Sequence, residues 1–259
     1  GGCDEGIHTS QRRCSPPPPA MAAAAAGEEP RSLRLVVVSD MDPGSARALA
    51  EHLVPRDEVA VDAVLACGAF VHDKSGDPSV LLGDMSAALA QLENVVCRVA
   101  FIPGPHDPPQ ALTGEVHLTP NSVNVHARAL PLLSDLYVAG YAERVEALGH
   151  HGAPPRGSGV EPLQEILDGA RRDCQGTGLL LFHPLSADMA ESLLALPGPG
   201  RACLGLALAP GPAEAPTPPV GPLEARRHGG MTLLHVPSLR RGMYAKLLLN
   251  KPEAGGGGG

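Results

Sequence analysis

Runs of apolar residues alternate with amphipathic stretches along most of the chain. The segment Leu33–Ser39 (LRLVVVS) is continuously apolar and β-branched, which is typical of a strand covered on both faces. Similar runs predict buried strands at Val61–Cys67, Val95–Ile102 and Gly178–Phe182. Between these runs, apolar residues recur at three- and four-residue steps, as expected for amphipathic helices. The alternation of the two patterns favours an α/β fold.

The remaining elements follow from the same periodicities. Helices are predicted at Ser45–Leu53, from Val80 to an end near Asn94, at Glu161–Arg171 and at Leu185–Leu196. Shorter strands are predicted around Ser122–His126, Asp135–Ala139 and Ala202–Ala209. Finally, Met231–Val236 and Met243–Leu249 suit a closing antiparallel pair of strands.

Both ends of the chain lack this patterning. Residues 1–30 begin polar and continue into Pro16–Pro19 and Ala22–Ala26, which predicts a disordered extension. Met21 followed by alanines suits a translation start, and residues 1–20 are then an upstream extension. At the other end, residues 251–259 are predicted to be a flexible glycine-rich tail.

A single domain is predicted over residues 31–250. Two internal segments, 149–159 and 210–227, are rich in proline and glycine and are predicted to be surface loops or disordered insertions. Neither is a domain boundary, because the strands on both sides of each segment belong to one sheet system.

The amino-acid composition and net charge of the chain limit the kinds of partner that it can bind. Hydrophobic residues make up 43% of the chain and aromatic residues 2%, so the core must consist mainly of Leu, Val and Ala. The 20 basic and 28 acidic residues give a net charge of −8, without a cluster of Lys and Arg. Binding to nucleic acid or to an anionic membrane is therefore not expected, since both need concentrated positive charge.

Cysteine usage points to a reducing compartment. The six cysteines form no CxxC pair, and Cys67 and Cys97 lie inside predicted strands, as buried reduced thiols would. No apolar stretch is long enough to span a membrane, and no secretory signal is recognisable. We expect an intracellular protein, in the cytoplasm or in a cytoskeletal or organellar assembly.

Residues capable of metal or proton chemistry follow several predicted strands. Asp40 and Asp42 end the first strand, His72 follows the second, His106 the third, and His183 ends the GLLLF strand. In α/β folds such strand ends converge on one edge of the sheet. The sequence therefore predicts that Asp40, His106 and His183 lie at a common edge.

The order of these motifs resembles that of the calcineurin-like metallophosphoesterase superfamily. The signature of that family is D-x-H, G-D-x-x-D/N, G-N-H-D/E, a His after a hydrophobic strand, and G-H-x-H. The resemblance covers roughly Leu33–Leu249, and includes a segment PSLRRG that is similar to the family's closing N-P-G-S-x-R-x-G. It implies a four-layer αββα sandwich, in which helices flank two mixed β-sheets. In that family two metal ions share a bridging Asp and activate a hydroxide that attacks phosphorus.

Several positions depart from the family pattern. The first Asp is kept as Asp40, but its His partner has become Asp42. The bridging Asp falls at Ala69, and the Asp or Asn three residues later is His72. The Asn ligand of the third motif is replaced by Pro105.

The later motifs are also incomplete. His106, at the family's catalytic histidine position, and the later metal ligand His183 are kept. In the last motif Leu206 and Leu208 align with the two histidines. Two dications in such an apolar pocket would face several kcal/mol of uncompensated desolvation each. The resemblance therefore implies that binuclear catalysis is lost.

The retained groups leave two interpretations of the old metal centre. Asp40, Asp42 and His183, with His72 as a fourth candidate, could hold one weakly bound Mn, Fe, Zn or Mg ion. Alternatively they are vestiges and no cofactor is bound, which the loss of the bridging ligand favours.

Three functions remain open at this level. The favoured one is a catalytically inactive phosphoesterase domain that serves as a structural or scaffolding subunit, bound to other protein subunits. The second is a metal-dependent phosphoesterase with a rebuilt or single-metal site. The third is a module that binds a phosphorylated ligand without turnover.

Overall fold

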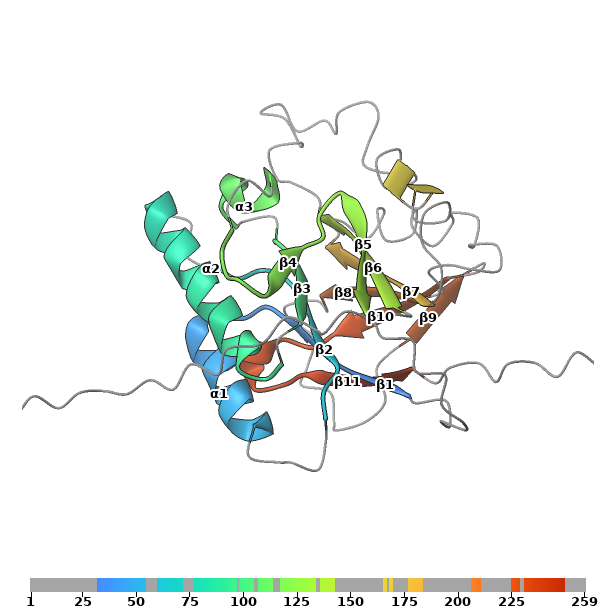
Figure 1. Ribbon diagram of the computed structural model, residues 1–259, viewed down its shortest axis with the longest axis horizontal. Coiled ribbons are helices and arrows are strands. Elements are labelled where there is room, and N and C mark those ends of the chain that lie inside the picture. The colour runs from blue at the N-terminus through green and yellow to red at the C-terminus, as the bar shows by residue number, and fades with distance from the viewer. Residues whose placement is uncertain are drawn as a thin grey trace, which may run out of the picture.

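Two mixed β-sheets pack face to face at the centre of the molecule, with helices over the outer face of one of them (Figure 1). Figure 1 is a computed structural model of the whole chain. The structure describes residues 32–54, 60–71, 77–96, 98–104, 107–113, 117–133, 136–142, 165–166, 168–169, 177–183, 206–210, 225–228 and 231–249.

The first sheet has five strands. Their order is β11 (Ala245–Leu249), β1 (Leu33–Ser39), β2 (Ala63–Cys67), β3 (Val99–Ile102) and β4 (Ser122–Asn124). Strands β1 to β4 are parallel, while β11 pairs antiparallel with β1. Alternate residues of β1 serve two different cores, because Val36 and Val38 face the helices while Leu35 and Val37 face the second sheet.

The second sheet has six strands. Their order is β5 (Arg128–Leu133), β6 (Leu136–Ala142), β7 (Thr177–His183), β8 (Leu206–Pro210), β10 (Met231–Val236) and β9 (Ala225–His228). The four central strands are parallel, and the two edge strands are antiparallel to their neighbours. Its inner face contributes Val138, Leu179 and Leu181 to the core between the sheets.

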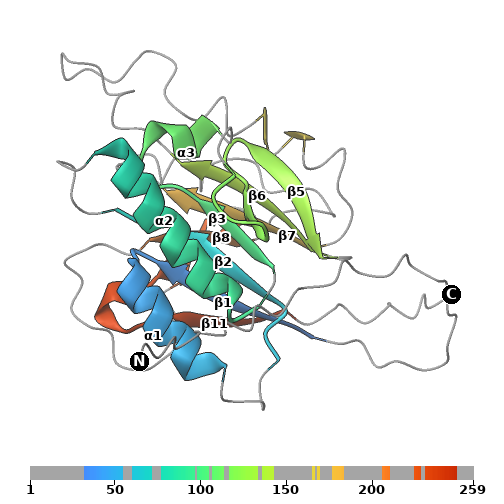
Figure 2. The same cartoon turned by 60° about the vertical axis from the view of Figure 1, so that its left-hand side comes forward.

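Two helices cover the outer face of the first sheet (Figure 2). Helix α1 (Pro43–Leu53) buries residues spaced three and four apart, from Ala46 to Leu53, and α2 (Pro78–Glu93) does the same from Met85 to Leu92. Each begins with an Asp cap followed by a proline, and α2 ends at Glu93 with Asn94 as its C-cap, near the predicted end. The described part of the chain has no helix long and apolar enough to cross a membrane.

The mixed α/β class with two sheets is confirmed, but the expected pairing of the last two strands is wrong. Instead of forming a hairpin, β10 lies in the second sheet and β11 in the first. The connection contains a short 3-10 helix, η2 (Leu239–Arg241), and carries the chain from one sheet to the other. This crossing lets Leu247 and Leu249 of β11 pack against the core between the sheets beside β1.

Three elements differ from the sequence prediction. Helix α3 (Pro109–Thr113) and the edge strand β5, which contains Pro131, were not expected. Strand β9 occupies residues 225–228, so the predicted loop over 210–227 is shorter at its C-terminal end. Of the predicted helix at Glu161–Arg171, residues 165–166 and 168–169 are described and helical.

Several expectations concern segments outside the described residues. These are the N-terminal extension, the C-terminal tail, the loop at 149–159, the helix at Leu185–Leu196 and Cys97. By contrast, Cys67 is a buried thiol in β2, as predicted, and burial raises its pKa to about 12.

Candidate functional site

The carboxyl ends of the parallel strands of both sheets meet at one edge of the sandwich. The hydroxyl of Ser39, the last residue of β1, donates to the carbonyls of Val236 (3.0 Å) and Pro237 (3.1 Å) at the end of β10. The Cys67 thiol, at the end of β2, is within hydrogen-bonding reach of the backbone of Phe182 in β7. Residues that follow these strands are therefore held close together, although they come from distant parts of the sequence.

Asp40 lies at this edge, directly after β1. Its φ of 48° is in the left-handed region, which Asp tolerates better than most residues. Its carboxylate accepts a hydrogen bond from the hydroxyl of Ser238, and its carbonyl accepts the N–H of Arg240 at 3.1 Å. The segment after β10 thus closes over the first motif.

Asp42 is the N-cap of α1. Its carboxylate accepts the N–H of Ser45 at 2.7 Å, and the Ser45 hydroxyl accepts the N–H of Asp42 at 3.0 Å. The other oxygen lies 3.1 Å from Nε of Arg240. The pKa of Asp42 is lowered, mainly by the Ser45 N–H and further by the Ser45 hydroxyl and the Arg240 charge, while partial burial opposes them. Both oxygens are engaged within the protein.

The second and third motifs meet through their backbones. A Cβ atom placed on Gly68 would lie 2.1 Å from the backbone nitrogen of Gly104, and one on Gly104 would lie 2.7 Å from Cα of Ala69. Such contacts exclude any side chain at either glycine. Ala69, which the family resemblance aligns with a bridging Asp, places its methyl group at this junction.

Asp107 holds the same junction together. It is 4% exposed, and its carboxylate accepts the N–H groups of Phe70 (2.9 Å), Val71 (2.9 Å) and Gly104 (2.6 Å). Burial raises the pKa of Asp107 to about 6, while these three donors act in the opposite direction. Asp107 is not among the site residues predicted from the sequence, although its place in the third motif was the available signal.

His183 ends β7 and is half-buried at the same edge. It pairs in register with Ala142, the last residue of β6. The structure therefore brings Asp40 and His183 to the common edge that the sequence predicted. The other predicted site residues from the second and third motifs, His72, Pro105 and His106, lie outside the described residues.

Leu206 and Leu208 lie within β8. Leu206 pairs with Leu179 of β7, and Leu208 pairs with Leu181. The strand continues to Pro210, so a residue that follows its carboxyl end has number 211 or higher. The two leucines consequently sit beside positions of the core between the sheets, short of the edge that holds Asp40 and His183.

The metal-ligating side chains of the described residues are dispersed. No three His, Cys, Asp or Glu side chains in this part of the chain lie close enough together to hold a metal ion. Asp42 faces α1 and Arg240, and Asp40 is bonded to Ser238. Asp40, Asp42 and His183 thus share an edge of the fold without forming a common ligand set.

Comparison with known proteins bears on the fold alone. Neither a family model nor a curated protein matches the sequence. A solved structure superposes on the chain with a TM-score of 0.56 at 12% sequence identity, covering 84% of this chain and 95% of its own. At that identity the shared feature is the mixed α/β arrangement of two sheets.

Proposed function

We propose that this chain is a degenerate calcineurin-like phosphoesterase domain that acts as a non-catalytic, scaffolding subunit of a protein assembly. The order of the strand-end motifs supports this family, together with the two face-to-face sheets and the helices over one of them. Tyr137, Leu180 and Phe182 on the outer face of the second sheet are also buried, so that face is covered as well. A covered outer face is what a four-layer αββα sandwich requires.

The observation that carries the loss of catalysis is the engagement of Asp42. A metal ligand must offer a carboxylate oxygen to the ion, but both oxygens of Asp42 are used by the N-terminus of α1 and by Arg240. Arg240 also places a permanent positive charge beside the first motif, which disfavours a nearby dication. Together with a methyl group at Ala69, these residues do not fit a two-metal centre.

Metal content and turnover test this proposal directly. Purified protein should contain less than one tightly bound transition metal per chain by elemental analysis. It should not hydrolyse an aryl phosphate when Mn²⁺ is supplied. Two metal ions per chain, with turnover that Asp40→Ala abolishes, would show that the domain is an enzyme.

The scaffolding role rests on two proline- and glycine-rich segments: 149–159, and the part of 210–227 that lies between β8 and β9, residues 211–224. Segments of this composition bury too little apolar surface to be stabilised by folding alone. They can nevertheless become ordered when they bind a partner. Affinity capture from native extract should recover specific protein partners with the intact chain and fewer with a version in which short linkers replace both segments. Equal recovery by both versions, combined with a monomeric intact protein, would contradict the role. The buried Cys67 thiol is consistent with a partner inside the cell.

A further inference from the structure

The edges of the two sheets are not equally protected against pairing with another strand. Of the described edge strands, β4 has three residues, β5 contains Pro131 and a register irregularity, and β9 includes Arg226 and Arg227. Short length, proline and charge are the usual features that prevent edge-to-edge association. Strand β11 carries one charged residue, Lys246, but it lacks proline and pairs regularly with β1 over all five of its residues.

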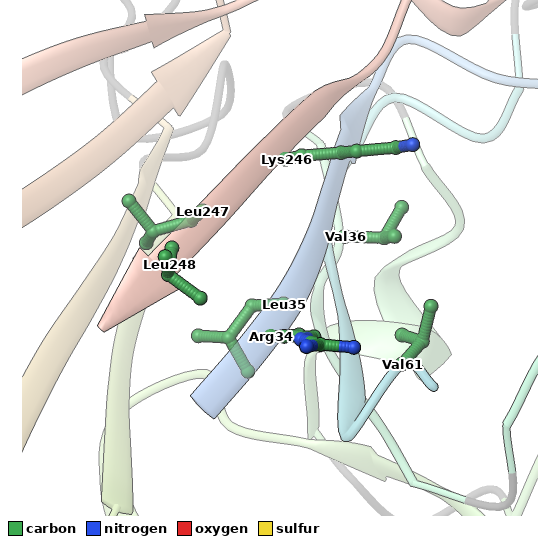
Figure 3. Close-up of a pocket in the computed structure, with 7 residues that line it drawn as sticks. All are labelled: Arg34, Leu35, Val36, Val61, Lys246, Leu247 and Leu248. Carbon is green, nitrogen blue, oxygen red and sulfur yellow. The ribbon is translucent and has the colours of Figure 1, made fainter. Parts of the chain in front are cut away.

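An apolar groove lies along this edge. It has a volume of about 190 Å³ and runs over β1 and β11, where Arg34, Leu35, Val36, Val61, Lys246, Leu247 and Leu248 line it. Figure 3 shows Arg34, Val36, Val61 and Lys246 on one side of the strand pair. Leu248 is 57% exposed and adds apolar surface to the groove.

The charged side chains of the groove are both basic. No carboxylate of the described residues is within ion-pair distance of the Arg34 guanidinium or the Lys246 ammonium. Asp62 is nearby, but it accepts the backbone N–H of Arg34 at 2.8 Å and does not line the groove. The Lys246 ammonium lies 5.8 Å from the ring centroid of Tyr244. An apolar floor with two cations suits a ligand that is apolar and acidic.

We infer that β11 is a docking edge for an extended segment of a partner protein, which adds a strand to the first sheet. The segment carries a carboxylate facing Lys246 and, two residues away on the same face, an apolar side chain facing Leu248. Backbone hydrogen bonds along an edge provide affinity, and alternate side chains provide specificity. This inference rests on the subunit role proposed above and names the surface that would serve it.

Charge argues against a second copy of this chain as the occupant. Two β11 strands paired about a two-fold axis would share one face, which places the Lys246 side chains of both copies close together. Like charges at neighbouring cross-strand positions are destabilising. A segment with the opposite charge removes this repulsion, so a different protein fits the edge better.

A peptide pair of matched length tests the inference. A short fluorescein-labelled peptide with the repeat Glu-Thr-Val-Thr should bind the full-length protein in fluorescence anisotropy, while the repeat Lys-Thr-Val-Thr should not. Lys246→Glu should weaken binding of the acidic peptide about fivefold or more and should admit the basic peptide. Arg47→Glu, an equal change in net charge on the exposed surface of α1, should leave both affinities unchanged.

Hydrogen exchange adds a readout specific to strand addition. The acidic peptide should slow exchange of the amides in residues 245–249 and leave those of α2 unaffected. The inference is overturned by absence of binding, by equal binding of both peptides, or by an acidic-peptide affinity that Lys246→Glu does not change. It is also overturned if the protein is a dimer that Lys246→Ala stabilises, because that variant removes the repulsion between the two lysines.

The peptide-binding results can be distinguished from the tests of the proposed function. Turnover with two bound metals would remove the non-catalytic role and leave the peptide result standing. Conversely, a partner captured from extract equally well by the parent protein and by Lys246→Glu would support a subunit role through another surface.

Discussion

At the scale of single residues, the candidate site is held by side chains that bond to backbone N–H groups. Asp107 connects the loops after β2 and β3, and Asp42 begins α1. Both are acidic residues in the region where the family resemblance predicts metal chemistry. The carboxylates of Asp42 and Asp107 bond to other groups of the protein. Replacing either residue should therefore change the free energy of unfolding by a measurable amount.

Asp107 should make stability depend on pH. Its pKa is raised from 3.8 to about 6 by burial, so the folded protein binds a proton that the unfolded chain has released between these values. The stabilisation is complete below about pH 4 and is lost as pH rises through 6. Relative to Asp107→Asn, the free energy of unfolding should fall by about 2–3 kcal/mol from pH 4 to pH 7.

Urea denaturation of the parent protein and of Asp107→Asn at several pH values between 4 and 7 measures the difference in their free energies of unfolding. Groups shared by the two proteins cancel in the comparison. If the parent protein instead gains stability relative to Asp107→Asn as pH rises, the three N–H donors outweigh burial and lower the Asp107 pKa.

Asp42 should contribute through its cap more than through its ion pair. Asp42→Ala removes the acceptor for the Ser45 N–H and should lower the free energy of unfolding by about 0.5–2 kcal/mol. Asp42→Ser keeps a capping oxygen but removes the charge near Arg240. Because that pair is partly exposed, Asp42→Ser should cost well under 1 kcal/mol. Similar losses in thermal denaturation for the two variants would show that the ion pair dominates.

At the scale of elements, the helices and strands follow the local pattern of apolar residues. The effect of a substitution within them depends on packing against neighbouring elements, as two glycines show. Gly178 of β7 pairs with Tyr137 of β6, and the buried tyrosine ring lies over it. Gly83 lies on the exposed side of α2, with open space where a Cβ atom would be. The sequence places Gly178 in a predicted strand and Gly83 in a predicted helix, but it does not show what a Cβ atom would meet at either position.

The same substitution should therefore have opposite effects at the two positions. A Cβ atom on Gly178 would lie 2.4 Å from Cζ of Tyr137, so Gly178→Ala should destabilise the protein by about 1–3 kcal/mol. Gly83→Ala should stabilise it by about 0.5–1 kcal/mol, because alanine favours the helix. Chemical denaturation of both variants provides the comparison. A stable Gly178→Ala protein would mean that the Tyr137 ring can move aside.

At the scale of the whole molecule, the two sheets enclose an apolar core that continues toward the candidate site. Leu206 and Leu208 pair with Leu179 and Leu181, two residues buried between the sheets. A histidine at position 206 would therefore be paired with a buried leucine position of β7, and a polar ring that is taken out of water needs a hydrogen-bond partner.

Leu206→His should destabilise the fold without creating a metal site. Full burial of a leucine side chain contributes about 1.5–3 kcal/mol, which sets the upper range of the expected loss in the free energy of unfolding. Isothermal titration with Zn²⁺ should give the same result for the variant and the parent. A variant as stable as the parent that binds the metal would show that this position opens onto a preserved cleft.

The buried strands β1, β2, β3 and β7 and the helices α1 and α2 could be predicted from the chain because their signals are local. Continuous apolar runs indicate strands covered on both faces, and three- and four-residue spacing indicates helices. The common edge of Asp40 and His183 also followed from the sequence, since both residues end strands. Strand β5 escaped prediction because Pro131 weakens a strand pattern and is tolerated at a sheet edge.

The sequence by itself determined the α/β class, the main elements and the types of residue at the strand ends. Tertiary structure alone decided that β10 and β11 belong to different sheets, because both strands are apolar and the choice depends on which core each can complete. It also decided the partners of the acidic residues, with Arg240 beside Asp42 and three backbone N–H groups around Asp107. A carboxylate at a strand end can bind a metal, cap a helix or join two loops, and the atoms that select among these come from distant parts of the chain.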